Sequence, residues 1–347
     1  MADDAPLRRR ATIRDVAQAA GVSRRTVTRV SLGHSHVGED VRRRTEAAIR
    51  ILRYRPDSQA QGLAWGRSNL VGMIYENPNP NYINDVQQGV IEGLRPHGLE
   101  LVVRRGEQAS PRFLAEVRTF AERLKLAGLV LTPPLSDDAR IATLLDEIGR
   151  PYVRIAARPL DAPDRMVVGG DRAGAREVGR HLLGLNHRRI GAVLGPANFI
   201  SAGERLAGLQ EGLAEGGLRV APERIERGGY TFESGIAAGE ALLARRPRPT
   251  AIFAGNDEMA AGVLQAAQRA GLRVPEDLTV IGFDDLDIAR SLSPPLTSVR
   301  MPTRQLGELA AWKLSGLAGR RLTDRDRPQT EAARLIVRRS CGPPPRA

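Results

Sequence analysis

The chain has 347 residues, of which 41% are hydrophobic and 27% charged, so it is long enough for several folding units and its composition excludes an intrinsically disordered protein. The single cysteine, Cys341, excludes an intrachain disulfide framework and a cysteine-rich zinc site. The net charge is +12, and residues 1–60 hold thirteen arginines against seven acidic residues. A basic end of this kind attracts polyanions such as nucleic acid, although charge alone is also compatible with solubility or with a membrane surface.

The N-terminal segment MADDAPLRRR does not have the pattern of a secretory signal, because acidic residues precede the basic run and no apolar stretch follows it. No later segment approaches the roughly 20 apolar residues that a membrane helix needs. We therefore expect a soluble, cytoplasmic protein without a membrane partner.

The first predicted helix covers residues 12–19, TIRDVAQA. Ile13, Val16 and Ala17 recur at helical spacing and would form one apolar face, and Thr12 is suited to cap the N-terminus. With a single apolar stripe, this helix can bury one side only.

A second helix is predicted after a turn of three residues. Gly21 supplies the permissive backbone that a tight turn requires, and Ser23 is suited to cap the helix. Its inward face carries Val27 and Val30, and two short helices joined in this way form a helix-turn-helix. The outward face presents donors suited to guanine edges and phosphates in a major groove, namely Arg24, Arg25, Thr28 and Arg29. A solvated basic helix in a bundle is the alternative interpretation.

The run TIRDVAQAAGVSRRTVTRV, residues 12–30, resembles the headpiece of the lactose-repressor (LacI) family of bacterial transcriptional regulators. The resemblance implies that the serine and threonine hydroxyls contact phosphates, while the arginines read bases from the start of the recognition helix. We expect the DNA-binding residues of the headpiece to be Thr12, Ser23, Arg24, Arg25, Thr28 and Arg29. The family commonly ends this helix with Val-Leu-Asn-Gly, whereas residues 30–33 read Val-Ser-Leu-Gly, so the asparagine that helps to anchor the helix end is absent.

A third helix is predicted over residues 41–56, where apolar residues repeat at helical spacing. The following segment, DSQAQGLAWG, stands where the family keeps a hinge helix, and Ala60, Leu63 and Ala64 occupy the matching DNA-binding positions. The resemblance implies that this helix orders only on DNA, lies in the minor groove and inserts the leucine of each subunit between two base pairs. A plain linker is the alternative.

From residue 69 onward, short apolar runs such as LVGMIY and AGLVLT alternate with helical patterns, which is typical of repeated β-α-β units in a parallel sheet covered on both faces. A second series begins at Asp171, and two sheets indicate two lobes with a ligand-binding cleft between their strand ends. The predicted fold is an all-α helix-turn-helix headpiece followed by an α/β body of two lobes with two parallel sheets, like that of periplasmic binding proteins. The expected boundaries are residues 1–56 for the headpiece, 57–68 for the hinge and 69–347 for the body, with a first lobe at about 69–165 and 298–324 and a second lobe at about 166–295 and 326–340.

The family resemblance extends over the body through LGLNHRRIGAVLGP, ERLAGL, FAGNDEMAAG and IGFDDLDIARSLSPPLTSV. It implies a set of cleft residues that suits a sugar: an arginine, amides, a carboxylate, a hydroxyl and aromatic rings. The positions that match the family are Ser201, Arg205, Tyr230, Asn256 and Asp284 in the second lobe. The first lobe adds Asn79 and Tyr82, which follow a strand end, and together these seven are expected to bind the ligand. Asn256 and Asp284 are alternatively helix caps.

Arg154 lies in a strand that ends with an aspartate in many relatives of this family. In the cleft, its charge would favour a ligand that carries an acid or a phosphate, and otherwise the side chain points to solvent. We include Arg154 among the expected ligand-binding residues.

Motifs of enzymes are absent from the sequence, because no GxSxG elbow, Walker loop or HExxH is present and no GxGxxG follows the first strand. We expect no catalysis, no cofactor and no metal. An exported solute-binding receptor would share the body but would have no use for a helix-turn-helix. The sequence therefore predicts a homodimeric repressor that binds double-stranded operator DNA and is released from it, by resemblance, when a small carbohydrate or sugar derivative binds between the lobes. A non-sugar or acidic effector is the alternative.

Overall fold

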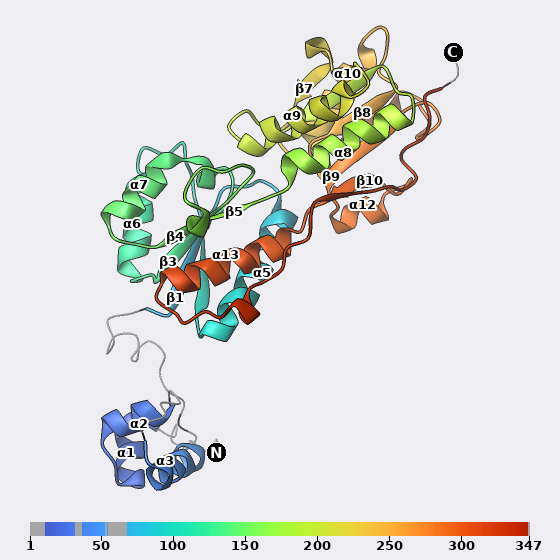
Figure 1. The fold of residues 1–347 in the computed structure, drawn as a ribbon. Coiled ribbons are helices and arrows are strands. Elements are labelled where there is room, and N and C mark those ends of the chain that lie inside the picture. The colour runs from blue at the N-terminus through green and yellow to red at the C-terminus, as the bar shows by residue number, and fades with distance from the viewer. Residues whose placement is uncertain (1–10, 32–36, 53, 55–67, 346–347) are drawn as a thin grey trace, which may run out of the picture. The chain divides into compact units, whose positions relative to one another are not determined.

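The computed structural model describes residues 11–31, 37–52, 54 and 68–345 (Figure 1). The chain divides into two compact units, Met1–Asn69 and Leu70–Ala347, which we call the headpiece and the body. The predicted hinge positions Ala60, Leu63 and Ala64 lie outside the described residues.

The described part of the headpiece contains three helices. They are α1 (Ile13–Ala20), α2 (Arg24–Ser31) and α3 (Glu39–Ile51). Helix α1 begins with the predicted cap: the Thr12 hydroxyl accepts the Asp15 N–H, and the Asp15 carboxylate accepts the Thr12 N–H at 2.7 Å. Gly21 ends this helix in left-handed backbone with φ 61°, a conformation that costs glycine little.

A small core joins the three helices. Val16 of α1 and Val27 of α2 are fully buried, and Ala48 of α3 completes the cluster. The inward valine face of α2 thus agrees with the prediction. Helix α3 is shorter than predicted, because it ends at Ile51, where the N–H of Leu52 bonds to the Ala48 carbonyl and closes the last turn.

The first lobe of the body is built on a parallel sheet with the strand order β2-β1-β3-β4-β5. Its strands are β1 (Leu70–Tyr75), β2 (Glu100–Arg105), β3 (Gly128–Leu131), β4 (Tyr152–Ala156) and β5 (Met166–Val168). One face is covered by α5 (Pro80–Leu94) and α13 (Thr303–Leu317), and the other by α6 (Phe113–Arg123) and α7 (Ala139–Glu147). Figure 1 shows α13 beside α5, and Gly89 permits their close approach, because a Cβ there would meet the Arg304 carbonyl oxygen at 1.8 Å.

The second lobe is built on a sheet with the strand order β11-β10-β9-β8-β6-β7, in which only β11 is antiparallel to its neighbour. Its strands are β6 (Ile190–Leu194), β7 (Ile225–Arg227), β8 (Ala251–Ala254), β9 (Thr279–Asp284), β10 (Thr297–Arg300) and β11 (Arg334–Ile336). Its helices are α8 (Asp171–Gly184) and α9 (Ile200–Ala214) on one face, α10 (Phe232–Ala244) and α11 (Asp257–Arg269) on the other, and the short α12 (Asp287–Ser291) after β9.

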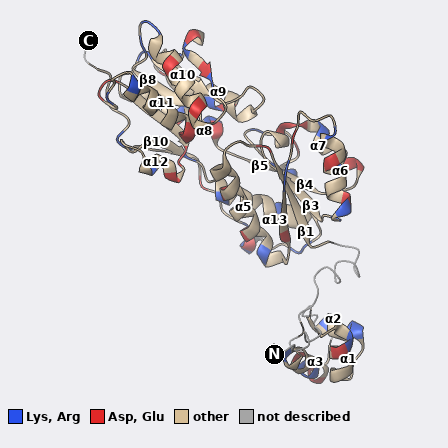
Figure 2. Ribbon diagram, turned by 180° about the vertical axis from the view of Figure 1, so that it is seen from behind, with Lys and Arg blue, Asp and Glu red and all other residues tan. Residues whose placement is uncertain are grey.

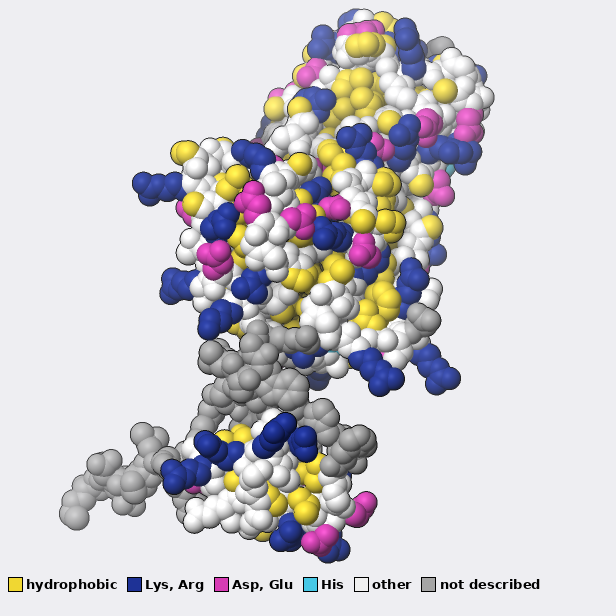
Figure 3. All heavy atoms as spheres, turned by 60° about the vertical axis from the view of Figure 1, so that its left-hand side comes forward, with side chains coloured by type: hydrophobic (Ala, Val, Ile, Leu, Met, Phe, Trp, Pro, Cys, Tyr) yellow, Lys and Arg dark blue, Asp and Glu magenta, His cyan; other side chains and the backbone are white. Residues whose placement is uncertain are grey.

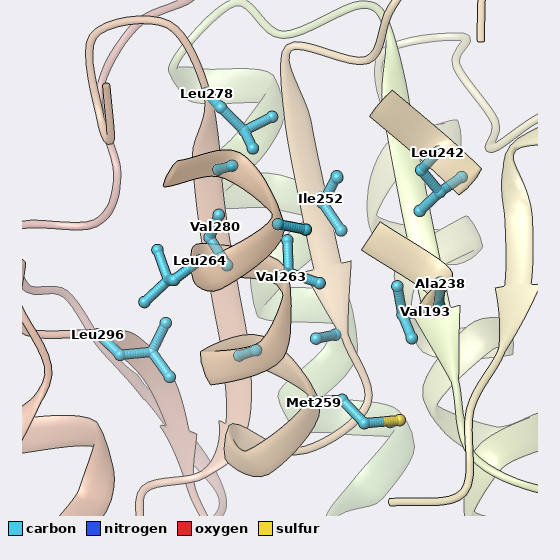
Figure 4. Close-up of a cluster of buried hydrophobic side chains, with 14 of the residues drawn as sticks. Val193, Ala238, Leu242, Ile252, Met259, Val263, Leu264, Leu278, Val280 and Leu296 are labelled. Carbon is cyan, nitrogen blue, oxygen red and sulfur yellow. The ribbon is translucent and has the colours of Figure 1, made fainter. Parts of the chain in front are cut away.

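Apolar side chains fill the space between these helices and the strands. In the cluster under α11, Val263 lies with Ile252 of β8 and Val280 of β9 (Figure 4). Along the outer surface of the same lobe, α8 and α9 carry acidic and basic positions side by side (Figure 2). Short 3-10 helices lie at Arg95–His97 (η1), Leu135–Asp137 (η2), Pro163–Arg165 (η3), Pro222–Arg224 (η4) and Asp324–Asp326 (η5).

The chain passes between the lobes after β5, after β10 and before β11. Strand β5 pairs with β4 in the first lobe, and β10 pairs with β9 in the second. The first two passages therefore come a few residues later than the expected boundaries near residues 165 and 298. Hydrophobic periodicity locates a short strand but does not show which sheet it joins.

Candidate functional site

The outward face of α2 carries the arginines that the sequence singled out. Arg24, Arg25 and Arg29 are exposed, whereas Val27 and Val30 are buried. Figure 3 shows basic side chains projecting from the visible surface of the headpiece. Exposed guanidinium groups at the start of a helix have the geometry that donates to base edges and phosphates in a major groove.

The hydroxyl residues around α2 take part in local hydrogen bonds. The Ser23 hydroxyl accepts the Thr26 N–H at 3.1 Å and so caps the helix. The Thr28 hydroxyl donates to the Arg24 carbonyl at 3.1 Å. Ser23 is exposed and Thr28 half-buried, so each hydroxyl still lies at the surface that α2 presents.

A pocket opens between the two lobes of the body, at the carboxyl ends of both sheets, which is where open α/β folds bind ligands. The empty space at this site is about 570 Å³, and this volume includes open solvent at the mouth of the pocket. Seven of the eight expected ligand-binding residues line it. The full lining is Asn77, Asn79, Tyr82, Pro133, Ile155, Ala156, Ala157, Gly169, Asp171, Phe199, Ser201, Arg205, Tyr230, Asn256, Asp284, Met301, Thr303 and Leu306.

Arg205 is the charged centre of this pocket. Its Nε donates to Asp171 Oδ1 at 2.8 Å, and one terminal nitrogen lies 3.2 Å from Asp284 Oδ1. The other terminal nitrogen donates to the Gly255 carbonyl, and the guanidinium carbon lies 3.9 Å from the centre of the Phe283 ring. The planar fork of the arginine thus bridges two buried carboxylates.

Burial and mutual charge set the ionisation of this cluster. Burial acts to lower the pKa of Arg205, but the carboxylates of Asp284 and Asp171 outweigh it and raise this pKa, so the arginine stays charged. Burial raises the pKa of Asp284 to about 6, although the neighbouring Arg205 charge acts to lower it. With every group ionised, one arginine and two carboxylates give the cluster an excess of negative charge.

Asp284 keeps an oxygen that a ligand could use. Its Oδ1 is close enough to Arg205 for an ion pair, but the angles are not those of a hydrogen bond, and this oxygen accepts none from the described residues. Asp284 does not cap α12, whose N-cap residue is Leu286. The helix-cap alternative is therefore wrong for Asp284, and its carboxylate faces the pocket.

Asp171 is a pocket residue that sequence reasoning missed. It is the first residue of α8, and only 5% of it is exposed. In the sequence it has the appearance of an ordinary acidic residue in a first helical turn, where the helix dipole favours negative charge. Its place shortly after the end of β5 was the available signal, because the other cleft residues follow strand ends in the same way.

The first lobe contributes Asn79 and Tyr82 from the N-terminus of α5. Asn79 is the N-cap, and its Oδ1 accepts the N–H groups of Asn81 at 3.0 Å and Tyr82 at 3.3 Å. Its Nδ2 is buried and has no hydrogen-bond acceptor in the described part of the chain. Burial and the charges of Asp171 and Asp284 raise the pKa of Tyr82, so its hydroxyl stays neutral and can donate.

Asn256 caps α11, as the alternative predicted, and it also lines the pocket. Its Oδ1 accepts the Met259 N–H at 2.9 Å as the cap of α11, and its Nδ2 donates to the Tyr230 carbonyl at 3.1 Å. The Tyr230 ring packs edge-on against Phe199, with 5.1 Å between ring centres, and its hydroxyl lies 3.4 Å from Ser201 Oγ. Asn256 lines the pocket and also fixes the aromatic wall that Tyr230 forms.

Arg154 does not line the pocket, which corrects the prediction for this residue. Side chains alternate along β4, so Arg154 lies on the opposite face from Val153 and Ile155. It is 4% exposed, lies 3.5 Å from Asp161 and stacks over the Tyr152 ring. The solvent-exposed alternative is wrong too, and within the described residues Arg205 is the only arginine of the lining.

The described residues contain neither a membrane-spanning helix nor a candidate metal site. None of the helices there is long and apolar enough to cross a membrane. No group of three or more His, Cys, Asp and Glu side chains in the same residues could hold a metal ion. Burial raises the pKa of the free Cys341 thiol to about 11, so this thiol is protonated at neutral pH.

Two family models match the chain. The model of bacterial regulatory proteins of the lacI family matches residues 12–57, which include the three headpiece helices. The model of the periplasmic binding protein-like domain matches residues 180–341, which include most of the second lobe and helix α13.

Similarity to known regulators extends over most of the chain. The HTH-type transcriptional regulator CelR of Thermobifida fusca is 34% identical over 343 residues, which is 95% of this chain and 96% of CelR. The ribose operon repressor of Escherichia coli K12 is 31% identical over 300 residues, 86% of this chain and 91% of the repressor.

Solved structures show the same similarity. A complex of transcriptional regulator CelR with cellobiose has a TM-score of 0.69 at 30% identity and covers 95% of this chain and 100% of its own. The lac repressor dimer bound to operator and the anti-inducer ONPF has a TM-score of 0.78 at 28% identity. The match covers 96% of this chain and 99% of the lac repressor chain.

Proposed function

The chain belongs to the lacI family of bacterial regulatory proteins, and from this membership we propose that it is a repressor whose body senses a small, uncharged carbohydrate. The protein is a DNA-binding transcription regulator controlled by a small effector, and it is not an enzyme. It works in the bacterial cytoplasm, where its operator DNA lies.

The arrangement around Arg205 is the observation that carries the sugar proposal. The two carboxylates, Asp171 and Asp284, already satisfy the charge of this arginine, so an anionic ligand would meet an excess of negative charge. Ligand hydroxyls suit the same groups, because they can donate to carboxylate oxygens and accept from the buried Nδ2 of Asn79. The alternative of an acidic effector depended on Arg154, which is not part of the lining.

Aromatic rings complete a site of this kind. Tyr82 and Tyr230 line the pocket from the two lobes, and Phe199 supports the Tyr230 ring. A ring offers an apolar surface to the C–H face of a sugar while the hydroxyls reach the polar groups. The names of relatives agree with this class of ligand, since one structure holds cellobiose and one relative is a ribose operon repressor.

We infer that the exposed face of α2 is the DNA-reading surface. In this proposal Arg24, Arg25 and Arg29 read base edges, while Ser23 and Thr28 contact phosphates. One headpiece reads one half-site, so a pseudo-palindromic operator requires a two-fold symmetric homodimer. The related lac repressor structure is a dimer on operator DNA, which supports this assembly.

A ligand screen tests the proposed effector class. The full chain is mixed with neutral mono- and disaccharides, sugar phosphates and sugar acids, and its melting temperature is recorded, because selective binding to the native state raises it. We expect a neutral sugar to raise the melting temperature of wild type. Stabilisation by sugar phosphates or acids alone would contradict the proposal, and equal binding to Asp284→Ala would show that the site residues are wrong.

A further inference from the structure

Asp257 lies behind the pocket wall without lining the pocket. It is the first residue of α11, and none of its surface is exposed. Its carboxylate accepts two hydrogen bonds near the turn that follows β9. The Leu286 N–H donates to Oδ2 at 2.8 Å, and the Ser298 hydroxyl donates to Oδ1 at 2.5 Å. A buried carboxylate is tolerated only when its oxygens are hydrogen-bonded in this way.

Ser298 extends this contact to a second backbone amide. Its hydroxyl oxygen accepts the Asp285 N–H at 3.1 Å while the same hydroxyl donates to Asp257. Asp257 therefore holds the two N–H groups that follow Asp284, one directly at Leu286 and one through Ser298 at Asp285.

The turn held by Asp257 has an unfavourable backbone. Asp284 has φ 103° and Asp285 has φ 55°, values that side-chain-bearing residues rarely adopt. Such a conformation persists only where its surroundings enforce it. Gly282 leaves room for the Asp257 carboxylate, because a Cβ at position 282 would lie 2.3 Å from Asp257 Oδ1.

We propose that Asp257 is a positioning residue for effector recognition: it fixes the turn that aims the Asp284 carboxylate at Arg205 and at the ligand. The role in recognition rests on the proposed function, in which Asp284 contacts the effector. Burial and the charges of Asp284 and Asp285 raise the pKa of Asp257 well above its ordinary value. The geometry assigns its action on the turn to the two hydrogen bonds that its oxygens accept and not to its charge.

Variants of Asp257 and Ser298 separate the effect of these hydrogen bonds from the effect of the charge. Asp257→Ala removes both acceptor oxygens, whereas Asp257→Asn keeps a carbonyl oxygen for the Leu286 N–H and an amide that can donate to Ser298. Ser298→Ala breaks only the contact through the hydroxyl. The matched control is Ser340→Ala. This serine is fully buried like Ser298 and also accepts a backbone N–H, but its hydroxyl donates to the Val280 carbonyl near the start of β9 and not to Asp257.

The binding test uses the full chain titrated by calorimetry with cellobiose and, in parallel, with ribose. We expect Asp257→Ala to bind at least about tenfold more weakly than wild type, with Asp257→Asn and Ser340→Ala within about threefold of it. In an Asp284→Asn background, Asp257→Ala should weaken sugar binding by less than about twofold, because Asp257 acts on the ligand only by positioning the Asp284 carboxylate. An equal loss in both backgrounds, or an Asp257→Asn variant as weak as Asp257→Ala, would overturn the proposal.

A test without ligand separates this proposal from the proposed function. If wild type binds neither sugar nor any other neutral carbohydrate, the effector class is wrong, and crystal structures of the ligand-free variants still decide the role of Asp257. The Asp284 carboxylate should leave Arg205 in Asp257→Ala and stay beside it in Asp257→Asn. An unchanged contact in Asp257→Ala would overturn the positioning role, and Ser298→Ala replaces that variant if it does not fold.

Discussion

The Nε of Arg205 lies 2.8 Å from Oδ1 of Asp171, and both side chains are more than nine-tenths buried. This ion pair links α9 to the start of α8 in the pocket lining, and Asp284 adds a second carboxylate from the end of β9. Buried charges of this kind depend on their partners, so the pocket contributes to the stability of the second lobe as well as to recognition.

Replacing Arg205 with methionine should strongly destabilise the body, because two buried carboxylates would lose their common partner. The expected cost is about 3–5 kcal/mol of unfolding free energy. Denaturation of the full chain in urea measures it, with Arg172→Met as the control, because Arg172 is exposed and pairs with Glu211 at the surface. Similar denaturation midpoints for the two variants would show that the buried cluster does not stabilise the fold.

Asp137 of η2 connects the two lobes, since its carboxylate accepts the Ile200 N–H of α9 at 3.1 Å. Burial raises the pKa of Asp137 to about 6, although this N–H acts to lower it. The folded protein then binds the proton more tightly than the unfolded chain, in which an aspartate has a pKa of about 4. The stability that this group contributes is complete below about pH 4 and is lost as the pH rises through about 6.

Asp137→Asn should therefore lose less stability than wild type when the pH is raised from about 4 to about 7, as measured by urea denaturation at a series of pH values. The control is Asp138→Asn. Burial acts to raise the pKa of Asp138, but hydrogen bonds from Arg140 and Gln108 outweigh it and lower this pKa, so its contribution is lost only as the solution becomes more acidic. Parallel curves for wild type and Asp137→Asn would contradict the prediction.

Local patterns in the sequence predicted the headpiece and the alternation of strands and helices in the body. The cap at Thr12 and the buried face at Val27 depend on neighbours within one or two helical turns, so spacing alone indicates them. The family resemblance, and not spacing, predicted that Arg205 and Asp284 line the pocket, and both do.

Two features of the pocket could not be predicted in this way. Arg154 was assigned to the pocket because it precedes a strand end, but the face of the sheet on which it lies depends on the exact register of β4. Asp171 was missed because its partner, Arg205, is distant in the sequence and meets it only through the packing of α8 on α9. Both errors concern tertiary contacts that periodicity does not encode.

Arg25→Ala should weaken operator binding by about 1–3 kcal/mol and relax the preference at one base pair of each half-site. Fluorescence anisotropy with the operator and with a scrambled duplex measures both effects. Arg50→Ala removes an equal charge from the exposed surface of α3 and should weaken binding to the two duplexes by the same factor. If Arg25→Ala also weakened both equally, Arg25 would contact the backbone and not a base.

Sedimentation of the full chain with its operator should give two protein chains for each duplex. The physical reason is that each headpiece can read only one half of a pseudo-palindromic site. A duplex with a single half-site serves as the control and should bind much more weakly. A stable complex of one chain with the full operator would contradict the homodimer.

The most direct measurement is a titration of operator DNA into the full chain with and without a saturating neutral sugar, with cellobiose tried first. Because binding free energies are linked, the sugar should weaken operator binding, and the operator should weaken sugar binding by the same factor, about 5- to 150-fold. A sugar that binds in the pocket, as shown by its loss in Asp284→Ala, but leaves the operator affinity unchanged would contradict the role of the body as the sensor that controls DNA binding.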